Sequence, residues 1–188
     1  MEALNALKQQ GKIRSIGVSN FSRAQLQEAQ QYGPIDSLQP PYSLFWRHVE
    51  TDLMPYCIEN KITILAYSPM AQGFLTGKFG PGHTFEKGDV RAKNKLFQPP
   101  MYDRVQQALT RLEPIARQKG ITLGQLALGW VISHSGTCAI AGARNAEQTA
   151  DNAAAGTITL SEQELADIDE IGRAVTDYLD DDPVMWNF

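Results

Sequence analysis

Short apolar runs alternate with amphipathic stretches along this chain, and this alternation predicts strands that alternate with helices. The apolar runs cover residues 13–19, 35–39, 62–67 and 138–141. Runs of this length are typical of single buried strands. Helical spacing covers residues 1–10, 22–31, 49–60, 102–119, 122–135 and 161–175, and a further helix begins at Asn145. Buried strands that alternate with amphipathic helices indicate an α/β fold with a parallel sheet.

Pairs of residues with the spacing of a capping box predict where four helices begin. In such a box a Ser, Thr or Asn side chain accepts a bond from the backbone three residues on, and a Gln or Glu side chain returns one. The pairs are Ser22 with Gln25, Thr122 with Gln125, Asn145 with Gln148, and Ser161 with Glu164.

Polar or small residues follow every predicted strand, and they help to choose between two architectures. An open doubly wound sheet and an arc of a (β/α) barrel both fit the order of elements. The residues at the strand ends are Ser19 and Asn20, Gln39, Tyr67 and Ser68, and 142–144. In barrels this end of the strands holds the active site. No GxGxxG motif follows the first strand, which argues against a Rossmann dinucleotide site in a doubly wound sheet. We therefore expect four parallel β/α units, about half of a barrel of roughly 250 residues.

Composition narrows the classes of function. The chain has 188 residues, a formal net charge of -4 and no basic cluster, which argues against a nucleic-acid partner. No run of 18 apolar residues is present, so we expect no membrane span. Cys57 and Cys138 both lie in apolar segments, which predicts two buried free thiols and a cytoplasmic location. We expect a single half-barrel domain over 1–188, with a long functional loop at 68–101.

The C-terminal tail at 177–188 has two parts of different character. Its acidic part, 177–182, is expected to be solvated, because a run of like charges is usually exposed. Its apolar part, 184–186, is expected to be packed.

The stretch 137–152, TCAIAGARNAEQTADN, predicts a strand, a sharp turn at Gly142 and a helix. Such a turn leaves free backbone N–H groups at a helix N-terminus, where phosphate binds well. Arg144 lies in the turn and has a guanidinium fork suited to phosphate. The residues that share one face of the helix are Gln148, Asp151 and Asn152. An ordinary strand-to-helix connection with a surface arginine has the same spacing, so the residues leave both interpretations open.

Four motifs in the same order and register closely resemble the aldo/keto reductase family. They are GKIRSIGVSNF (11–21), LQPPYSLFWR (38–47), ILAYSPMAQGFLTGKF (64–79) and GARNAEQTADN (142–152). The resemblance covers residues 1–172 and is similar to the branch of bacterial and plant reductases and potassium-channel β subunits. It implies that the chain is the C-terminal half of a TIM (β/α)8 barrel. It also implies NADPH-dependent reduction of aldehydes and ketones.

The resemblance implies a cofactor contact for each matching residue. Ser19, Asn20 and Gln39 would hold the nicotinamide carboxamide, and Tyr67 would stack on the nicotinamide ring. The loop over the pyrophosphate would comprise Ser68, Pro69, Met70, Gly73, Leu75 and Lys78, with Arg91 as a further phosphate contact. Arg144, after the turn at Gly142, would contact the 2′-phosphate and so favour NADPH over NADH. Gln148, Asp151 and Asn152 would contact the adenosine, although many relatives have Glu at the position of Asp151.

The catalytic Asp, Tyr, Lys and His of the family belong to the half that this sequence does not match. The resemblance therefore implies no catalytic residue here, and a small carbonyl substrate only where the N-terminal half is present. His48, His83 and His134 lie outside the family's histidine motif and are expected to be surface or capping residues. Trp46 and Trp186 are candidates for lining a substrate pocket, although surface packing explains them equally well.

A half barrel is expected to associate, because its first and fourth strands are open parallel edges. The inward faces of the strands would also expose a contiguous apolar patch. We expect self-association, with a homodimer that closes eight strands as the natural form, or pairing with the missing half. Two alternatives to a reductase half remain: a nucleotide-binding half barrel without turnover, and a truncated fragment that only self-associates.

Overall fold

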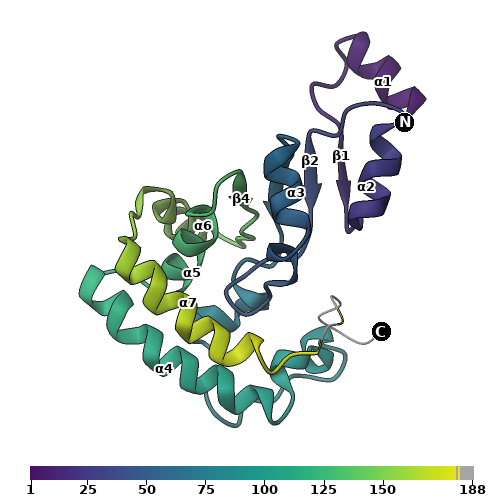
Figure 1. Cartoon of the computed structure of the whole chain (residues 1–188). Coiled ribbons are helices and arrows are strands. Elements are labelled where there is room, and N and C mark those ends of the chain that lie inside the picture. Colours follow the sequence, from purple (N-terminus) through teal and green to yellow (C-terminus); the bar gives the residue numbers. More distant parts are fainter. Residues whose placement is uncertain (181, 183–188) are drawn as a thin grey trace.

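The computed structural model describes residues 1–180 and 182, and its strands and helices alternate as predicted (Figure 1). The strands are β1 (Gly17–Ser19), β2 (Ser37–Gln39), β3 (Thr63–Ala66) and β4 (Thr137–Ala139). The helices are α1 (Glu2–Gln9), α2 (Arg23–Gln30), α3 (Leu53–Glu59), α4 (Met101–Lys119), α5 (Leu123–Ile132), α6 (Ala146–Ala154) and α7 (Glu162–Thr176). In the described part of the chain, none of the helices combines the length and the apolar character that crossing a membrane requires. The segment 184–186, which we expected to be packed, lies outside the described residues.

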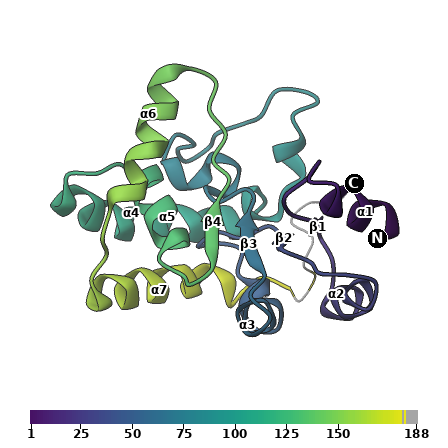
Figure 2. The same cartoon turned by 90° about the horizontal axis from the view of Figure 1, so that it is seen from above.

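The four strands form one parallel sheet in the order β1-β2-β3-β4. Figure 2 shows them in a row with α2 and α3 on one side. Within the described residues β1 and β4 each pair with one strand only, so both are edges of the sheet. This order confirms the predicted series of four parallel β/α units.

The strands are shorter than the apolar runs that predicted them. Predicted strand 13–19 contributes only Gly17–Ser19 to the ladder. At Ile16, directly before β1, the backbone amide donates to the Asp36 carboxylate at 2.7 Å. The same carboxylate forms an ion pair of 2.6 Å with Lys8. These two contacts lower the pKa of Asp36, the Lys8 contact more strongly. A side chain thus takes the place of regular pairing where β1 would otherwise begin earlier.

Three of the four predicted capping boxes form. Ser22, Thr122 and Ser161 each accept from the backbone three residues on, and Gln25, Gln125 and Glu164 return the bond. They start α2, α5 and α7, which confirms the helix starts that local spacing predicted.

The two faces of the sheet differ in burial. Leu38, Ile64 and Ala66 are fully buried on the helix side. On the other face one row crosses all four strands and is exposed or half-buried; it consists of Ser19, Gln39, Leu65 and Cys138. We expected this face to be a contiguous apolar patch; this row is mixed, with polar Ser19 and Gln39 on β1 and β2 and apolar Leu65 and Cys138 on β3 and β4.

Cys138 is exposed, which corrects the prediction that both cysteines are buried. Successive residues of a strand point to opposite faces, so Thr137 is buried and Cys138 faces outward. Cys57 has no exposed surface, and its burial raises the pKa of its thiol to about 11. A thiol with this pKa stays protonated at neutral pH and reacts poorly.

We therefore expect one thiol per native chain to react with Ellman's reagent at pH 7.5, and two after unfolding in guanidinium. Cys138→Ser should abolish the native reaction, and Cys57→Ser should leave it unchanged. Two reactive thiols in the native chain would contradict the burial of Cys57.

The loop at 68–101 is folded around a cluster of aromatic rings. Phe74 and Phe97 stack with centroids 4.2 Å apart, and Phe79 and Phe85 pack against Phe97 at 5.4 Å and 4.7 Å. The loop contains the short 3₁₀ helices η2 (Ala71–Thr76), η3 (Val90–Lys93) and η4 (Lys95–Phe97). Buried Asn94 donates to the side chain of Gln72 at 3.2 Å, which ties the two ends of the loop together.

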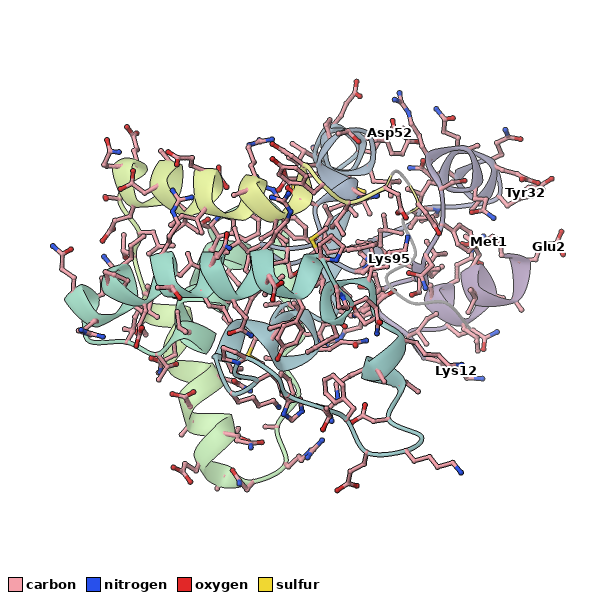
Figure 3. The ribbon with its side chains drawn as sticks, turned by 90° about the horizontal axis from the view of Figure 1, so that it is seen from below. Met1, Glu2, Lys12, Tyr32, Asp52 and Lys95 are labelled. Atoms are coloured by element: carbon pink, nitrogen blue, oxygen red, sulfur yellow. The ribbon has the colours of Figure 1, made fainter. Side chains whose placement is uncertain are left out.

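The acidic segment after α7 is paired with this loop. Lys95, labelled in Figure 3, contacts the carboxylates of Asp180 at 2.6 Å and Asp182 at 3.4 Å. Both carboxylates stay more than half exposed, at 61% and 51%, so the prediction of a solvated acidic segment is confirmed for these two residues, although the ion pairs were not predicted. Trp46 is only 1% exposed and stacks on His48, so it belongs to the core and does not line a pocket. Trp186, the other candidate, lies outside the described residues.

Candidate functional site

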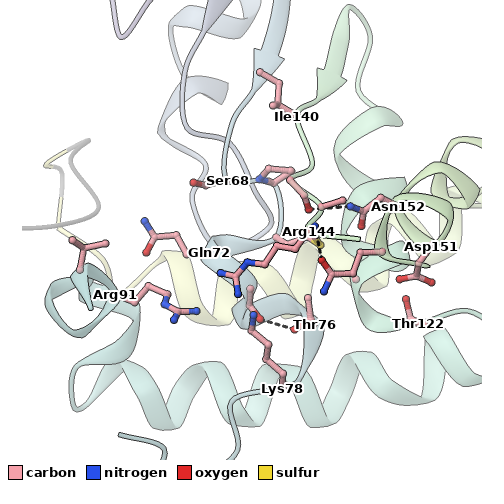
Figure 4. A pocket seen from close by; sticks show the side chains of 18 of the residues that line it. Ser68, Gln72, Thr76, Lys78, Arg91, Thr122, Ile140, Arg144, Asp151 and Asn152 are labelled. Carbon is pink, nitrogen blue, oxygen red and sulfur yellow. Dashed lines mark hydrogen bonds between the residues drawn. The ribbon is translucent and has the colours of Figure 1, made fainter. Parts of the chain in front are cut away.

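A pocket of about 900 Å³ opens where the loop after β3 meets the turn after β4 (Figure 4). Most of the residues that the sequence singled out line it: Ser68, Pro69, Met70, Gly73, Lys78, Arg91, Gly142, Arg144, Gln148, Asp151 and Asn152. Sequence reasoning missed further lining residues: Gln72, Thr76, Asp89, Val90, Thr122, Gly124, Ile140 and Ala143. Of these, Thr122 carried a local signal as the start of a helix, and Ala143 was noted only as one of the residues after the fourth strand.

The loop that follows β3 has an unusual backbone. Ser68, Ala71 and Gln72 have φ values of 52°, 49° and 55°, and Gly73 follows at 94°. Residues other than glycine seldom adopt positive φ, and where they do they cluster at binding and active sites. The amides of Ala71 and Gly73 donate within the loop, to the carbonyls of Ser68 at 2.8 Å and Met70 at 2.9 Å. The loop thus turns tightly where it lines the pocket.

Gly73 also makes room for Lys78. A Cβ atom at position 73 would lie 2.8 Å from Cε and 2.9 Å from Nζ of Lys78. The absence of a side chain here lets the ammonium group cross the loop toward the pocket.

The turn after β4 is held by side chains of α6. Asn145 caps α6 by accepting from the amide of Gln148 at 2.8 Å. Gln148 accepts from the amide of Arg144 at 2.9 Å, so the predicted return bond to Asn145 does not form and the capping box is incomplete. Asn152 donates to the carbonyl of Gly142 at 3.1 Å. Two side chains on the helix face that was predicted to bind a ligand therefore form hydrogen bonds to the turn that carries Arg144.

Three basic side chains converge on the pocket from three segments. Figure 4 shows Lys78, Arg91 and Arg144 pointing toward the same space. Partial burial lowers the pKa of Lys78, and the charges of Arg91 and Arg144 lower it further. Mutual repulsion of this kind is relieved when an anion binds between the cations. The pocket is therefore suited to a ligand with more than one phosphate.

A second group of predicted residues lies at the ends of β1, β2 and β3 and does not line this pocket. Ser19 donates to the carbonyl of Gln39 at 2.8 Å, and Tyr67 donates to the side chain of Asn20 at 3.2 Å. Partial burial raises the pKa of Tyr67. Tyr67 directly precedes Ser68 of the pocket wall, so the two groups adjoin along the chain.

Leu75 differs from the other predicted contacts. Its side chain is 1% exposed and lies in the core, so it does not line the pocket. Apolar residues in a binding motif need not touch the ligand, because some of them anchor the loop from below. The side chain of Leu75 thus belongs to the core, and its place in a loop over the pyrophosphate stays a prediction.

The histidines play structural parts. His134 lies just beyond α5, with Nδ1 2.9 Å from the carbonyl of Trp130. His83 packs among the aromatic rings of the loop, 4.7 Å from Phe79. His48 stacks on Trp46. Within residues 1–180 and 182, no group of three or more His, Cys, Asp or Glu side chains is placed to bind a metal.

These donor groups fit a nicotinamide adenine dinucleotide. The pocket supplies three cations at the phosphate end. The polar groups at the strand ends and the ring of Tyr67 lie at the other end of the same stretch of sheet. An elongated anion with an aromatic amide at its far end matches this order.

Comparison with known proteins supports this interpretation. The profile of the Aldo/keto reductase family matches residues 1–173. Aldo-keto reductase YhdN of Bacillus subtilis is 36% identical over 172 residues, which cover 90% of this chain and 52% of that protein. The NADH-specific methylglyoxal reductase of Escherichia coli is 35% identical, with 92% and 52% covered.

Solved structures show the same similarity. The glycerol dehydrogenase AKR11B4 from Gluconobacter oxydans superposes with a TM-score of 0.87 at 34% identity, over 94% of this chain and 54% of that one. An aldo/keto reductase from Klebsiella pneumoniae in complex with NADP and acetate gives 0.66 at 34% identity, over 90% and 52%.

The chain spans about half the length of these relatives. Its four parallel β/α units correspond to half of a TIM barrel, as the sequence predicted. A family profile that covers residues 1–173, together with matching folds, leaves one conclusion: this chain belongs to the aldo/keto reductase family.

Proposed function

We propose that this chain forms the cofactor-binding half of an NADPH-dependent carbonyl reductase. The observation that carries the proposal is the convergence of Lys78, Arg91 and Arg144 in one pocket at the carboxyl ends of parallel strands. Phosphate groups bind best where fixed cations and free backbone amides meet. The single half-barrel domain expected from the sequence would then serve as a scaffold for this pocket.

The phosphates of the cofactor would lie against the loop after β3 and the turn after β4. Lys78 and Arg91 would face the phosphates from the loop, and Arg144 would bind the 2′-phosphate from the turn. Asp151, which accepts from Gln125 at 2.8 Å, would lie beside the adenosine together with Gln148 and Asn152, which line the same pocket. We infer a preference for NADPH because Arg144 adds a charge at the phosphate end that NADH would not use.

The nicotinamide end would lie at the strand ends. Ser19, Asn20 and Gln39 offer hydroxyl and amide groups that suit a carboxamide. Tyr67 is held by its bond to Asn20, so its ring orientation is set before any ligand arrives. When bound, the nicotinamide supplies hydride to a carbonyl carbon. The residues of this chain bind and orient, and the proton donor would come from the other half of the barrel.

Direct titration tests the proposal. We expect the chain to bind NADPH, seen as increased NADPH fluorescence and quenched protein fluorescence, and to bind NADH more weakly. Because one wall of the nicotinamide site belongs to the other half, binding by this chain alone should be weak. No signal with either nucleotide at millimolar concentration would refute the proposal. Loss of aldehyde and NADPH together should require the N-terminal half of a relative supplied in trans.

We also propose that the open edges pair with another chain. Within the described residues β1 and β4 each have one free side, and open parallel edges tend to associate. A second copy would supply four more strands and close an eight-stranded ring. Sedimentation velocity over a range of concentrations should show a dimer. A single species with the mass of one chain at every concentration would refute this pairing.

A further inference from the structure

Arg91 is held along one edge by a neighbouring carboxylate. Asp89 precedes the short helix η3 and accepts from the amide of Arg91 at 3.0 Å. The same carboxylate accepts from Nε of Arg91 at 2.9 Å and also from Nη2. The edge of the guanidinium formed by Nε and Nη2 is therefore occupied, and the bond to the backbone fixes the carboxylate itself.

Aromatic rings hold the planar group from other directions. The Cζ atom of Arg91 lies 5.2 Å from the ring centre of Phe79 and 5.0 Å from that of Phe85. Cation–π contacts of this kind favour a guanidinium because it is flat and weakly hydrated. With one edge on Asp89 and two rings beside it, the side chain has little freedom to turn.

The remaining edge of the guanidinium faces the pocket. Asp89 and Arg91 both line the pocket. Within the described residues, the hydrogen bonds of the Arg91 guanidinium come from Nε and Nη2, and none comes from Nη1. The pKa of Asp89 is lowered to about 2, first by the side-chain bond from Arg91 and then by the backbone bond. The carboxylate is thus ionised at any pH at which a nucleotide would be bound.

We propose that Asp89 is a positioning residue that presents the Nη1/Nη2 edge of Arg91 to a phosphate group of the nucleotide. The proposal rests on the proposed function and adds to it a residue that does not itself touch the ligand. A carboxylate in an anion-binding pocket is otherwise unfavourable, because it repels the phosphates. Its bonds to Arg91 offset this repulsion, because a guanidinium that is already fixed loses less conformational freedom when it binds a phosphate.

The two effects of Asp89 have opposite signs, and this makes the test decisive. If it positions Arg91, Asp89→Asn should weaken NADPH binding by about 5- to 10-fold, a part of what a charge-assisted hydrogen bond contributes. If its charge only repels the ligand, the same change should tighten binding. Asparagine still caps the helix, so the thermal midpoint should not change. Asp167→Asn, which removes a charge on α7, is the matched control.

A double-mutant cycle separates positioning from a general effect on the loop. In the Arg91→Ala background, Asp89→Asn should no longer weaken binding, because no fork is left to position; only the repulsion is removed, so the dissociation constant should stay the same or fall. Asp89→Glu should recover part of the loss. A loss of binding that persists in the Arg91→Ala background would overturn the proposal, as would unchanged or tighter binding in Asp89→Asn alone.

The two nucleotides distinguish which phosphate is bound. A loss shared by NADPH and NADH assigns the fork to the pyrophosphate, and a loss confined to NADPH assigns it to the 2′-phosphate. Either result supports positioning. If the unaltered chain binds neither nucleotide, the proposed function fails and the positioning role fails with it. If the unaltered chain binds NADPH and Asp89→Asn binds equally well, the positioning role alone fails.

Discussion

Replacing Arg144 with alanine is expected to weaken NADPH binding by about 10- to 50-fold and NADH binding by less than about threefold. A charge-assisted hydrogen bond contributes roughly 1.5–3 kcal/mol, and the exposure of Arg144 favours the lower part of that range. NADH lacks the 2′-phosphate, so the change removes only the longer-range attraction between Arg144 and the pyrophosphate, which salt screens. Fluorescence titration of both nucleotides at fixed ionic strength measures the two ratios.

The fold around Arg144 should survive this change, which makes the effect specific. The bond from its amide to Gln148 uses the main chain, and the cap from Asn145 to Gln148 does not involve its side chain. Arg14→Ala removes the same charge before β1 and should leave both affinities unchanged. Equal losses for NADPH and NADH in Arg144→Ala would show that the guanidinium binds something the two nucleotides share.

Replacing Arg47 with alanine is expected to lower the free energy of unfolding by about 2–4 kcal/mol. Arg47 is 8% exposed and binds both carboxylate oxygens of Glu50, at 2.8 Å and 3.0 Å. It also binds Asp169 at 2.9 Å and lies 4.9 Å above the ring of Trp130. Removing one partner of a buried pair leaves the other charge uncompensated, which costs about 3–5 kcal/mol. The carboxylate of Asp169 is partly exposed, so water offsets some of this loss.

The network that Arg47 joins connects three distant segments. Tyr42 donates to Glu50 at 2.8 Å, and Trp130 on α5 donates to Asp169 on α7 at 3.0 Å. Burial raises the pKa of Tyr42, so its hydroxyl keeps the proton that it donates. The connection after β2 is thereby tied to α5 and α7, and the loss of Arg47 should loosen all three together.

Urea denaturation of the full chain measures the effect, and a surface ion pair supplies the control. Arg23 and Asp52 form a pair of 2.9 Å in which both side chains are about half exposed. Exposed pairs contribute no more than about 1 kcal/mol, so Arg23→Ala should be nearly neutral. Similar losses in the two variants would mean that the buried network contributes no more than a surface contact.

Local patterns were enough to predict the units of the fold. The capping boxes at Ser22, Thr122 and Ser161 form, because each involves only residues three apart. The apolar runs located all four strands, since burial on a parallel sheet demands apolar residues. The motifs around Ser68 and Arg144 located two walls of the pocket, because short segments with fixed spacing carry their own backbone shape.

Local patterns failed where a residue's neighbour is distant in sequence. Gln148 was predicted to complete a cap, but the amide of Arg144 lies within its reach and is taken instead. Asp180 is exposed as predicted, but no local pattern indicated its ion pair with Lys95, which lies 85 residues away in the sequence. Cys138 was predicted to be buried because its run is apolar, but strand geometry turns it to the open face.

The sequence by itself determined the order of strands and helices, the family, and the segments that build the pocket, because these depend on periodicity and on short motifs. Only the tertiary structure decided that Asp89 binds Arg91 beside two phenylalanine rings, that Arg47 joins three segments, and that Cys138 lies on the exposed face of the sheet. Each of these depends on which side chains meet across the fold. Such meetings are set by the packing of the whole chain, and no local spacing encodes them.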